Sequence, residues 1–222
     1  MPGEISLAHN GILFLDELPE FGRNTLEILR QPLEEKKITV SRAKYSVEYP
    51  ANFMLIGAMN PCPCGYYNHP TKECNCSINS VYRYMNKISG PMLDRIDMHI
   101  EVAPVTYPEL TNDIPSETSA EIRRRVVAAR ERQQQRFSGL EGIHTNAMMT
   151  QSMLKRLCPL NEACISLLER AMNKLELSAR AYSRIIKVAR TIADLDGSDD
   201  IAPQHIAEAI NYRSLDRKEW GR

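Results

Sequence analysis

Two adjacent carboxylates, Asp16 and Glu17, directly follow the apolar run Ile12–Leu15. The run is bounded by a glycine before it and a proline after it, and it predicts a strand buried on both faces. Such a strand would deliver both acids to the carboxyl edge of a sheet, where α/β folds bind ligands. In nucleotide-hydrolysing enzymes the first acid holds Mg²⁺ and the second activates the attacking water. The alternative is a strand that runs into a solvated acidic turn.

An amide side chain follows a second predicted strand. The apolar run Phe53–Met59 ends at Asn60. At the tip of a strand beside the acidic one, the Asn60 side chain would hydrogen-bond both the γ-phosphate of ATP and the attacking water. The alternative is that Asn60 is a turn former before Pro61.

The sequence lacks the loop that holds nucleotide phosphates in many such enzymes. No Gly-x-x-x-x-Gly-Lys-Ser/Thr stretch occurs in the 222 residues, so that backbone cradle for the β- and γ-phosphates is missing. The acidic strand begins at Ile12, which leaves no room before it for a phosphate loop with its own strand and helix. The chain is therefore either no nucleotide enzyme or the rear part of one, and alone it is predicted not to hydrolyse ATP.

Four cysteines, Cys62, Cys64, Cys74 and Cys76, form two close pairs. Two short pairs brought together supply four thiolates, which suit tetrahedral Zn²⁺. The alternative is a loop of reduced thiols. His69 lies between the pairs and is interpreted as a bystander, although it would also serve in place of one cysteine. No partner base is evident for a catalytic thiol.

Arginines raise two further questions. Arg95 lies between Asp94 and Asp97, just before a predicted strand at Met98–Val102. It either pairs with a neighbouring acid or projects into a neighbouring subunit's site as an arginine finger.

The stretch from 116 to 137 is either a solvated helical face or a stripe that contacts nucleic-acid phosphates. Its arginines are Arg123, Arg124, Arg125, Arg130, Arg132 and Arg136.

Composition sets modest bounds. Lys plus Arg and Asp plus Glu each number 28, so the net charge of 0 predicts no polyanion partner beyond local clusters. No uninterrupted apolar run approaches 18 residues and no basic-then-apolar leader is present, which predicts a soluble, cytoplasmic protein without a membrane partner. The cysteine layout is not that of a secreted disulfide scaffold.

Three prolines within residues 104–116 predict a linker between two domains. Residues 1–103 mix short strands and helices, whereas residues 117–222 read as helical, so the predicted fold is α/β followed by all-α. The predicted elements, besides the strands above, are a helix at 24–35, a β-hairpin at 37–49, and helices at 116–137, 161–177, 179–195 and from 203 onward.

Four ordered motifs carry a family resemblance. They are Pro2–His9 with Gly11–Phe21, Ala58–Gly65, Ser89–Asp97, and Ser178–Arg180 with Arg184 and Ala189–Leu195. They resemble, in this order, the Walker B, sensor 1, arginine-finger and sensor 2 regions of the Mg-chelatase-like AAA+ ATPases, within them the ComM/YifB group. The similarity spans positions 2 to 213, and what is missing is the Walker A half and the domain before it.

The resemblance implies the rear half of a AAA+ P-loop NTPase core, strands 3-4-5, followed by a helical lid. It implies that Asp16 holds Mg²⁺, that Glu17 is the general base, and that Asn60 positions the water. Arg95 would act in trans, and Arg180, with Arg184 as the runner-up, would reach the γ-phosphate of ATP. Without strand 1 as its partner, strand 5 is expected to shift toward strand 4, to pair irregularly or to pair with a neighbouring chain.

The same resemblance implies a ring, expected to be a hexamer, that hydrolyses ATP and acts on DNA in branch migration, with the missing amino-terminal part as a further partner. A magnesium-chelatase-type motor is one alternative. The cysteine cluster and the sequence of Ser89–Asp97 favour a ComM-like motor over a chelatase motor. A non-enzymatic, zinc-containing scaffold is the other alternative, since the chain has no phosphate loop.

Overall fold

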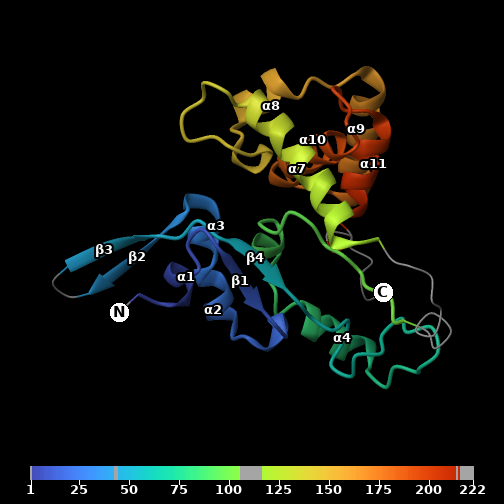
Figure 1. Cartoon of the computed structure of the whole chain (residues 1–222). Coiled ribbons are helices and arrows are strands. Elements are labelled where there is room, and N and C mark those ends of the chain that lie inside the picture. The colour runs from blue at the N-terminus through green and yellow to red at the C-terminus, as the bar shows by residue number, and fades with distance from the viewer. Residues whose placement is uncertain (1, 43–44, 106–116, 214, 216–222) are drawn as a thin grey trace. The chain divides into compact units, whose positions relative to one another are not determined.

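The computed structural model describes residues 2–42, 45–105, 117–213 and 215, and these separate into two compact units (Figure 1). The first unit holds the described residues of Met1–Ile96, and the second holds those of Asp97–Lys218. Each unit has a hydrophobic core of its own. The predicted linker, residues 104–116, lies outside the described residues from 106 onward.

The first unit contains a parallel pair of short strands, β1 (Ile12–Leu15) and β4 (Met54–Gly57), which pair residue for residue. Backbone bonds extend the ladder past both strands. The Ala58 N–H donates to the Leu15 carbonyl at 2.9 Å, and the Leu18 N–H donates to the Ala58 carbonyl at 2.9 Å. The two predicted strands are therefore confirmed, and their carboxyl ends share one edge.

The prediction that these strands are buried on both faces is wrong. Alternate residues of a strand point to opposite faces, and the core of this unit lies on one side only. That core includes Leu18, Leu26, Leu29, Phe53, Ile88 and Met92, against which Leu13, Leu15 and Leu55 pack. On the other face, Ile12 is 59% exposed, Phe14 57%, Met54 57% and Ile56 41%. The sheet unit thus leaves a row of large apolar side chains in contact with solvent.

The helices of this unit are short. They are α1 (Glu4–Leu7), η1 (Leu18–Glu20), α2 (Arg23–Ile28), α3 (Arg30–Glu35), α4 (Ile78–Met85) and α5 (Gly90–Leu93). The helix predicted at 24–35 is therefore split into α2 and α3. Pro32 explains the break, because its ring clashes with the carbonyl four residues earlier, at Ile28, and proline has no N–H to donate.

The predicted hairpin is confirmed and consists of β2 (Lys37–Arg42) and β3 (Tyr45–Pro50) in antiparallel pairing. It projects from the short helices of its unit (Figure 1). Most of its described side chains are exposed, including Tyr45 at 67%. The alternating pattern in the sequence therefore identified a strand pair that buries little of its surface.

The strand predicted at Met98–Val102 does not form, and that prediction was wrong. A strand needs a neighbouring strand for its backbone, but the His99 N–H donates to the Tyr212 carbonyl, at 2.6 Å, just after a helix. Ile100 is 68% exposed and Val102 85%. The segment has the apolar composition of a strand but no paired edge.

The second unit is helical, as predicted. Its elements are α7 (Ser119–Arg136), η2 (Asn146–Met148), α8 (Gln151–Leu157), α9 (Glu162–Leu175), α10 (Ala179–Leu195) and α11 (Pro203–Asn211). Ser178 caps α10 by accepting a hydrogen bond from the Ala181 N–H, and Pro203 opens α11, both as expected. Sequence reasoning missed η2 and α8. No helix in the described part of the chain is long and apolar enough to span a membrane.

A buried charged network ties α7, η2 and α10 together. Asp194 on α10 accepts from Arg136 of α7 at 2.5 and 2.8 Å and from the Asn146 amide at 2.8 Å. Arg190 lies 3.1 Å from the same carboxylate and donates to two backbone carbonyls beyond the end of α10. The side chain of Asp194 is fully buried, so this carboxylate is neutralised inside the protein.

Candidate active site and metal site

The parallel pairing of β1 and β4 gathers three polar side chains at one edge. Asp16 and Glu17 follow β1 directly, and Asn60 follows β4 after two residues. All three residues are exposed, and neither carboxylate forms an ion pair with any described residue. The edge therefore offers two unpaired acids and an amide to a ligand.

The backbone at Glu17 turns sharply. Its φ and ψ of 49° and 46° are left-handed, which costs a non-glycine residue roughly 1–2 kcal/mol. The Asp16 carboxylate accepts the Glu17 N–H at 2.9 Å, and η1 follows at once from Leu18, with Pro19 in its first turn. The chain thus leaves the strand through a left-handed turn at the second of the two acids.

Tyr84, which sequence reasoning did not single out, lies beside Asn60. Its side chain on α4 is 6% exposed. Burial raises the pKa of the Tyr84 hydroxyl, a hydrogen bond with the Asn60 backbone opposes this, and the carboxylates of Glu20 and Glu17 raise the pKa further. The Lys87 ammonium lies 5.5 Å from the ring centroid. No sequence pattern had singled out position 84.

The four clustered cysteines come together as predicted. The Sγ of Cys62 lies 3.3 Å from that of Cys64 and 3.7 Å from that of Cys74, and Cys64 and Cys74 are 3.5 Å apart. All four sulfurs, including that of Cys76, lie within 4.8 Å of one another. Ligands around tetrahedral Zn²⁺ with Zn–S bonds of about 2.3 Å are about 3.8 Å apart. The donor set and its spacing therefore fit one zinc ion.

The thiols of this cluster have unequal acidities. A hydrogen bond from the Tyr66 backbone, with help from the other thiols, lowers the pKa of Cys64 to about 6. At Cys74 a backbone hydrogen bond from Cys76 lowers the pKa, but burial and the neighbouring thiols outweigh it and raise the pKa to about 12. Several thiolates this close together repel one another unless a positive charge lies between them. A divalent metal ion would supply that charge.

The loop that presents the cysteines is tightly folded. The Gly65 N–H donates to the Cys62 carbonyl at 3.0 Å, and Gly65 has a φ of +82°, which favours glycine. The Nδ1 of His69 accepts the N–H groups of Thr71 at 3.2 Å and Lys72 at 3.1 Å. The interpretation of His69 as a bystander agrees with these contacts, since its Nδ1 is occupied by the loop backbone.

Arg95 is not presented to solvent in this chain. It is 6% exposed, its guanidinium lies 2.8 Å from the Glu34 carboxylate, and it donates to the Pro91 carbonyl at 2.5 Å. Its Nε is buried and has no hydrogen-bond partner among the described residues. The neighbouring acids Asp94 and Asp97 are therefore not its principal partner, and a role in trans requires that the Glu34 pair opens.

The two predicted lid arginines occupy the first turns of α10. Arg180 is exposed near the start of the helix, and Arg184 forms an ion pair with Asp97. Both residues belong to the second unit. A helix N-terminus carries partial positive charge, so Arg180 and the helix end together favour an anion.

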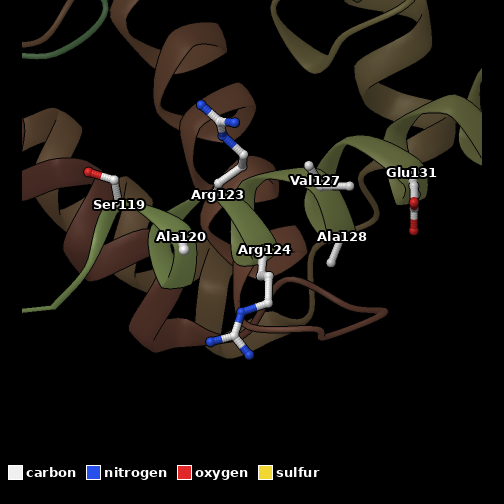
Figure 2. Close-up of a pocket in the computed structure, with 7 residues that line it drawn as sticks. All are labelled: Ser119, Ala120, Arg123, Arg124, Val127, Ala128 and Glu131. Carbon is white, nitrogen blue, oxygen red and sulfur yellow. The ribbon is translucent and has the colours of Figure 1, made fainter.

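The arginines of α7 divide into two groups. Arg125, Arg132 and Arg136 pair with Glu117, Asp199 and Asp194, respectively. By contrast, Arg123, Arg124 and Arg130 are exposed and form no ion pair with any described residue. Figure 2 shows Arg123 and Arg124 extending in opposite directions from an open pocket on the outer surface of α7. The residues that line this pocket all lie on α7, and none belongs to the polar edge of β1 and β4.

Both units match known protein families. The family described as magnesium chelatase, subunit ChlI, matches residues 1–110, and the family described as its C-terminal part matches residues 116–213. The four motifs in the sequence therefore lie within two family matches that follow each other along the chain.

Relatives cover nearly all of the chain. The protein is 47% identical over 220 residues to the uncharacterized protein YifB of Escherichia coli, covering 97% of this chain and 42% of YifB. It is 48% identical over 217 residues to the competence protein ComM of Haemophilus influenzae, covering 97% of this chain and 41% of ComM. The chloroplastic magnesium-chelatase subunit ChlI of Glycine max is 24% identical over 94% of this chain and 44% of its own length.

The chain spans about two fifths of the length of the YifB and ComM relatives that it matches. Each of these two matches covers 97% of this chain. The chain belongs to the Mg-chelatase-like family, in the group that contains ComM and YifB.

Proposed function

We propose that this chain supplies the hydrolytic edge and the lid of a AAA+ ATPase, and that a phosphate-binding half must join it before ATP is hydrolysed. The observation that supports this most directly is the parallel pairing of β1 and β4, which brings Asp16, Glu17 and Asn60 to one edge. Because phosphoryl transfer depends mainly on positioning and electrostatic stabilisation, a chain without a phosphate loop has the acid and amide but not the cradle.

The proposed roles follow from side-chain chemistry. Glu17 takes a proton from the attacking water, and Asn60 orients that water by hydrogen bonding. The water oxygen bonds to the γ-phosphorus, the bond to the β-bridging oxygen breaks, and ADP leaves with the electron pair. Asp16 would hold Mg²⁺, which neutralises charge on the phosphates when it is bound. Both acids are exposed and form no ion pair within the described part of the chain, as this division of labour requires.

Arginines complete the proposal. Arg180, with Arg184 as the runner-up, would contact the γ-phosphate from the lid. Arg95 would stabilise the transition state in the site of a neighbouring subunit of a hexameric ring. The Glu34 pair that buries Arg95 in the single chain would have to open on assembly, and binding energy at the subunit interface would offset that cost.

DNA is the proposed substrate of the assembled motor. Arg123, Arg124 and Arg130 support it, because they are exposed arginines without an ion pair among the described residues, and such groups bind phosphates and release counterions. The competing motor is of the magnesium-chelatase type, and ATP-dependent unwinding of forked DNA separates the two. The cysteine cluster would hold Zn²⁺ in a structural role, which would also serve a non-enzymatic scaffold.

A hybrid protein tests the proposal. In it, this chain replaces the region of Haemophilus influenzae ComM that it matches, so that the preceding part of ComM is present. The hybrid is expected to release phosphate from ATP, whereas the chain alone is not. Glu17→Gln should retain ATP binding and lower turnover by at least about 100-fold, because it removes the general base. Glu48→Gln, an exposed carboxylate of the hairpin, is the matched control and should not change turnover.

Two results would overturn this reading. The first is a correctly folded hybrid, judged by circular dichroism, that binds ATP without hydrolysing it. The second is turnover by the chain alone that disappears in Glu17→Gln, since it would mean that no phosphate-binding half is needed.

A further inference from the structure

We propose that Glu34 is an internal substitute for a phosphate group, which retains the Arg95 guanidinium inside its own subunit until a neighbouring subunit presents a stronger anion. The role of Arg95 in trans rests on the proposed function, whereas its retention by Glu34 does not. Glu34 is a positioning residue in this scheme, because it contacts Arg95 and not the nucleotide. Two further carboxylates, those of Glu20 and Glu27, hold the segment that carries Arg95.

The contact between Arg95 and Glu34 joins a buried charge to a partly exposed one. The side chain of Arg95 is 4% exposed and that of Glu34 is 37% exposed, and the guanidinium lies 2.8 Å from the carboxylate. A guanidinium does not lose its proton in a protein, so a buried one needs an anion beside it. Glu34 supplies that anion from the end of α3.

The hydrogen bonds of Arg95 are incomplete in this position. One terminal nitrogen donates to the Pro91 carbonyl at 2.5 Å, and the other faces Glu34. The Nε is buried and has no hydrogen-bond partner among the described residues. An unsatisfied buried donor is unfavourable, so the retained position leaves part of the guanidinium's bonding capacity unused. An anion that engages more of these donors would therefore bind Arg95 in preference to Glu34.

Three acidic residues at regular intervals contact the segment that ends at this arginine. They are Glu20, Glu27 and Glu34, each seven residues after the one before. The Lys87 ammonium lies 3.2 Å from both carboxylate oxygens of Glu20, and the Ser89 hydroxyl donates to Glu27 at 2.5 Å. The third contact is the arginine pair itself. The acids and their partners follow the same order along the chain, so the segment is held at three points.

The three contacts hold the segment in different ways. The side chains of Glu20 and Lys87 are each about half exposed, so their pair contributes little stability. Glu27 is held more firmly, because it bonds with Ser89 and lies 2.6 Å from the Arg30 guanidinium. Hydrogen bonds from Ser89 and Arg30 lower the pKa of Glu27, which keeps it charged. The first two acids therefore anchor the segment, and only the third neutralises a buried charge.

An anion presented by a neighbouring subunit would take the place of Glu34. The γ-phosphoryl group has three peripheral oxygens, one more than a carboxylate, and its charge is spread over them during transfer. Glu34 is already partly exposed, so its carboxylate regains water when the guanidinium leaves. Because Glu27 still holds Ser89, the long side chain of Arg95 moves while its segment stays anchored. The arginine is thus withheld in an isolated chain and released beside a loaded site.

Chemical labelling of arginines tests the retention in the chain as it exists. Phenylglyoxal modifies exposed guanidinium groups, and mass spectrometry of peptides gives the rate at Arg95. Glu34→Gln should raise that rate at least about tenfold, because a neutral amide does not compensate the buried charge and the guanidinium turns out to solvent. Glu35→Gln, at the adjacent exposed acid of α3, is the matched control and should leave the rate unchanged. The exposed Arg123 should react equally in all three proteins.

Local unfolding would also expose Arg95, so a second measurement monitors the fold of the sheet unit. The Ala58 N–H donates to the Leu15 carbonyl at 2.9 Å, and its hydrogen exchange reports on the strand pair. Faster labelling of Arg95 with unchanged exchange at Ala58 supports the retention. Unchanged labelling in Glu34→Gln would overturn it. Labelling and Ala58 exchange that accelerate equally would also overturn it, because Glu34 would then stabilise the whole unit.

Turnover in the hybrid protein provides the second readout. Glu34→Gln should raise kcat for ATP about 3- to 30-fold while KM changes less than about twofold, because a larger fraction of Arg95 is then free to enter the neighbouring site. Glu35→Gln should leave both constants unchanged. An active hybrid in which Glu34→Gln leaves kcat unchanged or lowers it would overturn the inference. A hybrid without turnover, in which Glu34→Gln still accelerates labelling of Arg95, would contradict the proposed function but support the retention.

Discussion

Carboxylates serve opposite purposes in the two units of this protein. In the helical unit, Asp194 is fully buried between Arg136 and Arg190. In the sheet unit, Asp16 and Glu17 are exposed and have no ion-pair partner among the described residues. A carboxylate already neutralised by two guanidinium groups stabilises a fold, whereas two unpaired acids at a strand end are available for a ligand. The environment of a charge, more than its type, separates structural from chemical residues here.

Metal removal is expected to produce the largest difference between the units. Structural zinc contributes roughly 10 kcal/mol or more of apparent binding free energy to the site that it organises. A chelator should therefore unfold the loop from Cys62 to Cys76 while the helices of the second unit keep their circular dichroism signal. Elemental analysis should find about one zinc per chain, lost in Cys62→Ser or Cys76→Ser. No zinc, with all four thiols freely titratable, would leave a loop of reduced thiols.

The next largest effect concerns the buried acid. Asp194→Ala should lower the free energy of unfolding of the helical unit by about 3–5 kcal/mol, because it leaves Arg136 and Arg190 as uncompensated buried charges. Urea unfolding followed by circular dichroism measures it. Asp16→Ala is the matched variant in the sheet unit and should change stability by less than about 0.5 kcal/mol. Similar losses in the two variants would break the comparison.

Apolar side chains allow the same contrast. Ile185 on α10 is 1% exposed, and Ile185→Ala should cost about 2–5 kcal/mol of unfolding free energy. Phe14 on β1 is 57% exposed, and Phe14→Ala should cost less than about 1 kcal/mol in the chain alone. The measurement is urea unfolding of both variants, with the sheet unit monitored by hydrogen exchange. A loss at Phe14 as large as that at Ile185 would mean that the outer face of the sheet is covered in solution.

A further prediction concerns the helix cap at the start of α7. Thr118→Ala should cost about 1 kcal/mol, because Thr118 and Glu121 form a capping box. Hydrogen bonding from the Thr118 backbone lowers the pKa of Glu121. A carboxyl whose pKa falls on folding stabilises the protein above its unfolded pKa, and that stabilisation is lost as the pH falls through the folded pKa. The cost of Glu121→Ala should therefore shrink in acid, and thermal unfolding at several pH values checks it.

The elements that local patterns control were predictable. The hairpin alternation, the Ser178 cap and the position of Pro203 each act within a few residues, and the structure confirms all three. The gathering of four cysteines was also predictable, because two short pairs flank one loop. The resemblance of the four motifs to the Mg-chelatase-like family is confirmed by the family matches.

Features that depend on distant neighbours were not predictable. The apolar run at Met98–Val102 looks like a strand, but strand formation depends on an edge that no described residue supplies. Arg136 belongs to an arginine-rich run that suggested a solvated face, yet its partner Asp194 is 58 residues away. Arg95 similarly found Glu34 rather than its neighbours in sequence. Chain patterns identify a charge, but only the fold identifies its partner.

Because β1 and β4 pair residue for residue, the edge that they form tolerates substitutions within β4 better than insertions or deletions there. One residue added within β4 would exchange the inner and outer faces for the residues on one side of the insertion, and it would shift Asn60 relative to β1 by about 3.3 Å along the strand direction. Substituting the outer residues Met54 or Ile56 would leave that edge in place. In the hybrid protein, single-residue insertions at any site within β4 should therefore abolish ATP turnover, whereas insertions between β2 and β3 should be tolerated. The number of residues in β4 therefore matters more to the position of Asn60 than the identity of its outward-facing side chains.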